Sequence, residues 1–85
     1  MIHFKLRSLD SVDLTEQLRI LAEFQAFIEK DLAFYQTAQE DMAELQARFP
    51  ENAERFRILA EAYELDIQIA KTKLIWIKKQ IADRK

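Results

Sequence analysis

Apolar residues recur at alternating steps of four and three through the second half of the chain, which is typical of one buried face of an α-helix. The residues of this first stripe are Phe56, Ala60, Tyr63, Ile67, Ala70, Leu74, Ile77 and Ile81. A second stripe with the same spacing consists of Ile58, Ala62, Leu65, Ile69, Thr72 and Trp76. Because two residues turn a helix by about 200°, the stripes lie on nearly opposite sides. We therefore predict a helix that needs packing partners on both sides, and one neighbouring helix covers only one of them.

The first half of the chain predicts another long helix, with one broad apolar face. Every seventh position from residue 14 is apolar, namely Leu14, Leu21, Ile28, Tyr35, Met42 and Phe49. A neighbouring run consists of Ile20, Phe24, Phe27, Phe34, Ala38 and Leu45. At about 100° per residue these two runs are adjacent, so the face is wide enough to contact both the second helix and another chain.

Breaker and capping residues set the expected boundaries. Asp13 followed by Glu16 resembles a capping box, which opens a helix over residues 13–49. Pro50 disfavours helical geometry at Phe49, and Asn52 or Pro50 can start a second helix over residues 51–83. Such a short connection makes the two helices antiparallel neighbours. Residues 1–12 are expected to form an arm or short helix, because an alternating apolar segment in a helical chain has no strand to pair with.

The composition supports an all-α fold for a single domain of residues 1–85. The chain has no Gly and only one Pro, whereas hairpins and tight turns usually draw on Gly. A chain of 85 residues has a thin core unless copies associate. We therefore predict a long antiparallel helical hairpin that dimerises into a four-helix arrangement.

The two stripes are assigned to different contacts, and the reverse assignment is an open alternative. The predicted core within one chain is Leu21, Ile28, Tyr35, Met42, Phe56, Tyr63, Ile67, Leu74, Ile77 and Ile81. The predicted dimer interface is Ile58, Ala62, Leu65, Ile69, Thr72, Trp76, Phe24 and Phe27.

Catalytic, metal and cofactor sites are not expected. His3 is the only histidine and has no carboxylate at ligand spacing, and the chain has no Cys and no Gly-rich phosphate loop. The many carboxylates are better explained as a solvated face. An enzyme site formed at a dimer interface would need buried charged residues, which the second helix's stripes lack. The aromatic residues on the stripes fit core packing, with a hydrophobic ligand cavity between subunits as the alternative.

Charge and hydropathy limit the classes of binding partner and the cellular location that we expect. The net charge of −2 argues against nucleic acid as a direct partner. No apolar run approaches the roughly 18 residues of a membrane span, and no signal-peptide core opens the chain, so we expect a cytoplasmic protein. The basic segment 71–85, with Trp76, resembles a membrane-surface binder. Because the apolar stripes continue into this segment, a packed helix is the better interpretation, and no membrane partner is expected.

The overall pattern resembles the C-terminal helical domain of PadR-like transcriptional regulators. The features that carry this resemblance are an apolar-basic opening at residues 2–7, an acidic polar turn, a long helix beginning near Leu14, and a second helix. On that second helix the matching residues are Tyr63, Glu64, Ile67, Ala70, Lys73, Leu74 and the segment Ile75-Trp76-Ile77.

The resemblance implies a homodimerisation domain, and since some members of the family bind ligands near the dimer interface, a hydrophobic small-molecule effector is a candidate partner. In such regulators the tail helices hold two winged-helix DNA-binding heads at a fixed spacing. That head would precede residue 1, so DNA would be a partner only through a domain absent from this sequence. The alternative is a stand-alone helical interaction protein or adaptor that pairs with another helical protein.

Overall fold

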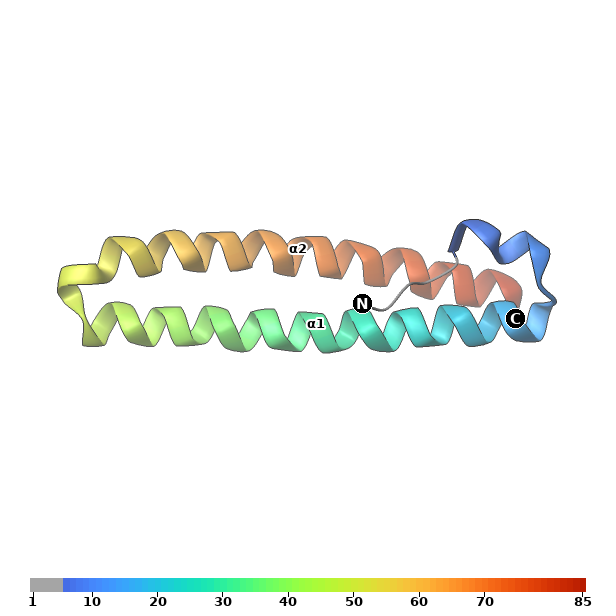
Figure 1. The fold of residues 1–85 in the computed structure, drawn as a ribbon, viewed down its shortest axis with the longest axis horizontal. Helices are drawn as coiled ribbons and strands as arrows, with labels where there is room; N and C mark the ends of the chain where they lie inside the picture. Colours follow the sequence, from blue (N-terminus) through green and yellow to red (C-terminus); the bar gives the residue numbers. More distant parts are fainter. Residues whose placement is uncertain (1–5) are drawn as a thin grey trace.

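The computed structural model describes residues 6–85, and they form two long antiparallel helices joined by a tight connection (Figure 1). A 3₁₀ segment, η1 (Leu6–Ser11), precedes helix α1 (Leu14–Arg48). A short 3₁₀ turn, η2 (Pro50–Asn52), then leads into helix α2 (Ala53–Arg84). No strand occurs in this part of the chain, which confirms the predicted all-α hairpin. The predicted bounds 13–49 and 51–83 differ from the observed ones by one or two residues.

Local interactions explain where α1 begins and ends. The backbone N–H of Glu16 donates to Oδ1 of Asp13 at 2.8 Å, so Asp13 is the N-cap. At the other end, Phe49 has a non-helical backbone with φ −126° and ψ 73°, as expected for the residue before Pro50. Its N–H still bonds to the carbonyl of Leu45 at 2.9 Å. Asn52 makes no side-chain capping bond, so the proline turn, rather than an asparagine cap, starts α2.

Burial is concentrated at the end of the hairpin where α1 begins and α2 finishes. The buried apolar cluster is Leu9, Ile20, Leu21, Ile28, Ala70, Leu74 and Ile77. Towards η2 the facing residues Met42, Phe56 and Tyr63 are only half-buried. Among the described residues no polar side chain is buried. The half of the hairpin near η2 is therefore the less well covered half.

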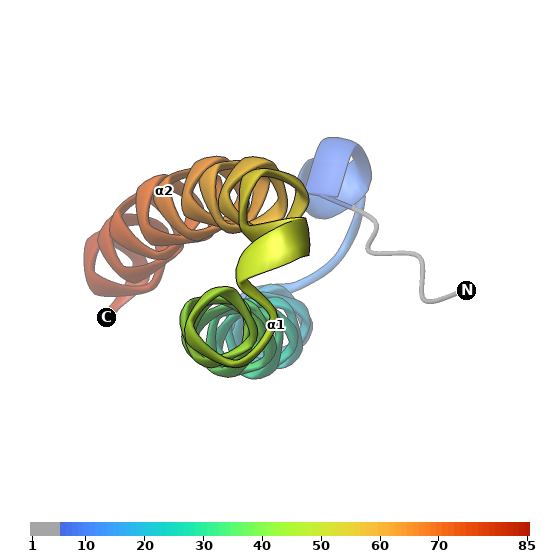
Figure 2. The ribbon, with the colours of Figure 1, turned by 90° about the vertical axis from the view of Figure 1, so that its left-hand side faces the viewer.

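The η1 segment packs against this well-buried end. Figure 2 shows η1 beside the α1–α2 pair, at the end farther from the η2 connection. Leu9 is buried in the apolar cluster, and Leu6 packs against it. Gln17 joins three parts of the chain, because its Nε2 donates to the carbonyl of Val12 at 2.9 Å and its Oε1 accepts from Nε of Arg84 at 3.0 Å. Ile2, His3 and Phe4 lie outside the described residues.

Candidate protein–protein interface

The second stripe forms a row of exposed apolar side chains along α2. The exposed fractions are 53 % for Ile58, 59 % for Leu65, 45 % for Ile69 and 43 % for Trp76. Ala62 and Thr72 are also exposed. The first stripe, by contrast, contains buried residues, namely Ile67, Ala70, Leu74 and Ile77. The helical repeat therefore presents one stripe to α1 and leaves the other on the surface.

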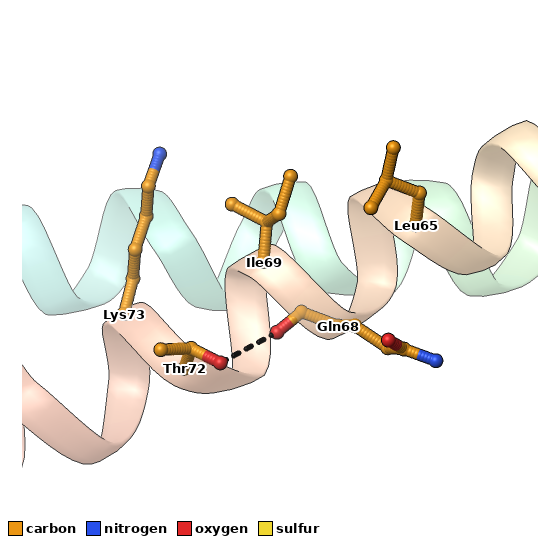
Figure 3. Close-up of a pocket in the computed structure, with 5 residues that line it drawn as sticks. All are labelled: Leu65, Gln68, Ile69, Thr72 and Lys73. Carbon is orange, nitrogen blue, oxygen red and sulfur yellow. Dashed lines mark hydrogen bonds between the residues drawn. The ribbon is translucent and has the colours of Figure 1, made fainter.

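A shallow hollow lies in the middle of the second stripe. It has a volume of about 320 Å³ and is lined by Leu65, Gln68, Ile69, Thr72 and Lys73. Figure 3 shows Leu65, Ile69 and Lys73 projecting from the same side of α2, with α1 behind them. Thr72 Oγ1 donates to the backbone carbonyl of Gln68 at 3.0 Å (Figure 3). Because its hydroxyl is satisfied within the helix, Thr72 fits an apolar contact surface.

The second stripe adjoins a groove between the two helices. This groove, of about 240 Å³, is lined by Ile28, Asp31, Tyr35, Asp66, Ile69, Ala70 and Lys73. Ile69 and Lys73 border both the hollow and the groove. A helix that docks on the second stripe can therefore also reach residues of α1.

Tyr35 gives this groove an aromatic wall. Its ring lies 6.4 Å from that of Tyr63, centroid to centroid, and 5.7 Å from that of Phe34 in an edge-on arrangement. Burial raises the pKa of Tyr35, and the charges of Asp31 and Asp66 raise it further. The phenol is therefore neutral at physiological pH and can donate a hydrogen bond to a polar atom of a ligand or partner.

Phe24 and Phe27 are placed differently from the other predicted interface residues. Both are half-buried, and both pack against the apolar cluster within the chain. On α1 the strongly exposed aromatic is instead Phe34, at 64 %. It lies in the same apolar run as Phe24 and Phe27. The spacing therefore indicated Phe34 as a surface-contact residue, although the predicted interface does not include it.

The residues of the predicted core all lie on the inner faces of the hairpin, but to different depths. Leu21, Ile28, Ile67, Leu74 and Ile77 are buried. Tyr35, Met42, Phe56, Tyr63 and Ile81 are half-buried. Of these half-buried residues, Ile81 lies near the end of α2. The other four lie in the middle of the hairpin or in its half near η2, where side chains of the second stripe are also exposed.

Some polar and charged side chains near the stripes form hydrogen bonds within α2 or between α1 and α2. Arg57 bonds to both Glu54 and Glu61, which lie one turn before and after it on α2. The Arg57 hydrogen bond lowers the pKa of Glu54. Between the helices, Gln39 Nε2 donates to Glu64 Oε2 at 2.9 Å, and this bond, with a second from Gln68, lowers the pKa of Glu64.

The described part of the chain holds no group of His, Cys, Asp or Glu side chains that could bind a metal ion. His3 lies outside it. Within the same residues, neither helix has a stretch long and apolar enough to cross a membrane.

The fold and this surface therefore define a helical hairpin with an unpartnered apolar stripe. No protein-family model, curated protein or solved structure matches the chain. The resemblance to PadR-like regulators stays a prediction.

Proposed function

We propose that this chain is a homodimerisation domain of the PadR-like type. The observation that carries the proposal is the second stripe, whose large apolar side chains are all about half exposed or more on a single helix face. An apolar row that spans most of α2 is more than isolated surface residues, and such surfaces typically mark contacts between proteins. A single hairpin also has a thin core of its own, because half of its first-stripe residues are incompletely buried. A chain of this size therefore gains stability from burying a further apolar surface against a second copy.

In this proposal the domain sets the distance between two DNA-binding heads, as in the regulators that it resembles. Residues 6–85 contain no winged helix, and the proposal assigns DNA contacts to a separate domain of such a regulator. The hollow at Leu65 and Ile69 and the groove at Tyr35 adjoin the same surface. They are the places where a hydrophobic effector with one polar group would bind and change the packing of the dimer.

The test is the mass of the protein in solution as a function of concentration, by sedimentation equilibrium. The wild-type chain is expected to be a dimer at micromolar concentration. Ile69→Glu places two charges in the interface, one from each copy. Because burial of an isoleucine side chain contributes about 1.5–3 kcal/mol, we expect dimer dissociation to increase roughly a hundredfold or more.

A matched control lies on the same helix. Ile75 is 74 % exposed and lies about 120° around α2 from Ile69, so Ile75→Glu introduces the same charge outside the second stripe. This variant should stay dimeric. A wild-type chain that is monomeric at all concentrations would refute the homodimer. A monomer that instead forms a 1:1 complex with another amphipathic helical protein through Ile69 would support the adaptor alternative.

A further inference from the structure

We propose that two copies pair antiparallel through α2, with the two-fold axis at the height of Ile67. This inference rests on the homodimer proposed above and specifies its geometry. Leu65 of one copy then packs on Ile69 of the other, Ile58 packs on Trp76, and Ala62 packs on Thr72. Three features of α2 lead to this arrangement.

The first feature is the spacing of the second stripe, because the order of steps between its residues is the same from either end of the helix. Its steps are four, three, four, three and four residues, so reversing the helix about Ile67 places every member opposite another member. The smallest residues, Ala62 and Thr72, then face each other, and large residues face large ones. Arg55 and Lys79 occupy the next stripe position at either end. A shift by one heptad in either direction would put one of these cations into the apolar row, so the register is specific.

The second feature is the unequal charge of the two halves of α2. Residues 53–66 carry four acidic and two basic side chains, whereas residues 67–84 carry five basic side chains and one acidic one. Antiparallel pairing brings the acidic half of one copy next to the basic half of the other. Parallel pairing would place like charges side by side over the whole contact and would also align the helix dipoles unfavourably.

The third feature is the unequal burial along the hairpin. The end with η1 and the apolar cluster is well packed, whereas the half near η2 leaves Phe56 and Tyr63 half-buried and Ile58 and Leu59 exposed. In the antiparallel dimer the well-packed end of each copy lies beside the open half of the other. Ile58, in the open half of one copy, therefore receives an apolar contact from Trp76, at the well-packed end of the other copy. Phe56 and Tyr63 lie on the first stripe and face α1 instead.

One feature of this register opposes association. Asp66 flanks the second stripe on the side facing α1, and the two copies of this carboxylate approach each other near the axis. Asp66 is half-buried and lines the groove together with Lys73. The lysine lies in the same groove and offsets part of the repulsion between the carboxylates.

Distances between spin labels distinguish the arrangements. The chain has no cysteine, so Lys71→Cys and Ala82→Cys each provide one attachment site, and both positions are exposed and off the second stripe. At 1.5 Å per residue, antiparallel pairing separates two labels along the helix axis by about 12 Å at position 71 and by about 45 Å at position 82. In a parallel dimer the axial separation is zero at both positions.

Pulsed electron paramagnetic resonance on the full chain, at a concentration where sedimentation shows a dimer, is the measurement. We expect a much longer distance at position 82 than at position 71. Similar short distances at both positions would overturn the antiparallel inference and leave the homodimer standing. A monomer in sedimentation would instead remove the homodimer itself. Circular dichroism of each labelled variant, compared with wild type, checks that the helices are intact.

Discussion

Leu21 on α1 and Ile77 on α2 are both completely shielded from solvent and belong to the same apolar cluster, although 56 residues separate them in sequence. They lie near the beginning of α1 and the end of α2. The cluster to which they belong therefore closes the open end of the hairpin. The connection at Phe49-Pro50 holds the other end covalently, so the cluster contributes most where the chain itself gives no constraint.

Shortening Ile77 tests the importance of that cluster. Ile77→Ala should lower the free energy of unfolding by about 2–5 kcal/mol, because it removes buried methyl groups and leaves a cavity beside Leu21. The measurement is urea denaturation followed by circular dichroism at one fixed protein concentration. Ile75→Ala removes the same atoms from an exposed position of the same helix and should change stability by less than about 0.5 kcal/mol. Equal losses in the two variants would contradict the observed orientation of α2.

The fluorescence of Trp76 reports directly on the second stripe. It is the only tryptophan in the chain and is 43 % exposed. If a second copy covers it, raising the protein concentration through the dissociation constant should shift its emission to shorter wavelength, because the indole leaves water. Ile69→Glu should keep the long-wavelength emission at the same concentrations. Emission that stays constant while light scattering shows dimer formation would place the interface elsewhere.

The spacing of apolar residues was sufficient to predict both helices, the break at Pro50 and the all-α hairpin, because amphipathic periodicity and a single proline determine these features locally. It also separates the two stripes of α2, since residues such as Ile67 and Ile69 lie on different sides of any regular helix. Depth of burial was not predictable in the same way. It depends on the tertiary apolar cluster, to which η1 contributes Leu9 and against which Phe24 and Phe27 pack. Phe34 belongs to the same run but is left exposed.

Polar contacts between residues far apart in the sequence could not be predicted from the sequence pattern either. Gln17 and Arg84 lie 67 residues apart and meet because α1 and α2 have nearly the same length and run antiparallel. Gln39 and Glu64 meet in the half of the hairpin near η2 for the same reason. Neither pair has a spacing signature, since each depends on the register that the apolar contacts impose.

The bond between Gln39 and Glu64 predicts how stability depends on pH in acid. The pKa of Glu64 is lowered in the folded protein, chiefly by the Gln39 hydrogen bond. A lowered pKa means that this stabilisation is complete above the ordinary glutamate value of about 4.3 and is lost as the pH falls through the lower folded value. Glu64→Gln cannot be protonated, so its unfolding midpoint should fall less than that of wild type between about pH 6 and about pH 3.

Gln39→Ala is the complementary variant for that experiment. It removes the main donor while keeping the Glu64 carboxyl group, so its acid dependence should also be shallower than that of wild type. The double variant should have the same acid dependence as Glu64→Gln alone, because neither variant has a titratable group at position 64. Thermal unfolding by circular dichroism across the pH series provides the comparison. An unchanged acid dependence in both single variants would show that other carboxylates control it.

Asp66 provides a test that should strengthen association instead of weakening it. In the antiparallel register its two copies approach each other near the axis, so Asp66→Asn removes one like-charge repulsion while keeping the size of the side chain. We expect dimer dissociation to decrease about two- to tenfold at low salt, and the gain to shrink as added salt screens the charges. Sedimentation equilibrium at low and high ionic strength measures both effects. Asp41→Asn makes the same change at an exposed position of α1 and should have a smaller effect. Weaker association of Asp66→Asn at low salt would mean that the carboxylate makes a net favourable contact across the interface, which contradicts the net repulsion that the proposed register predicts.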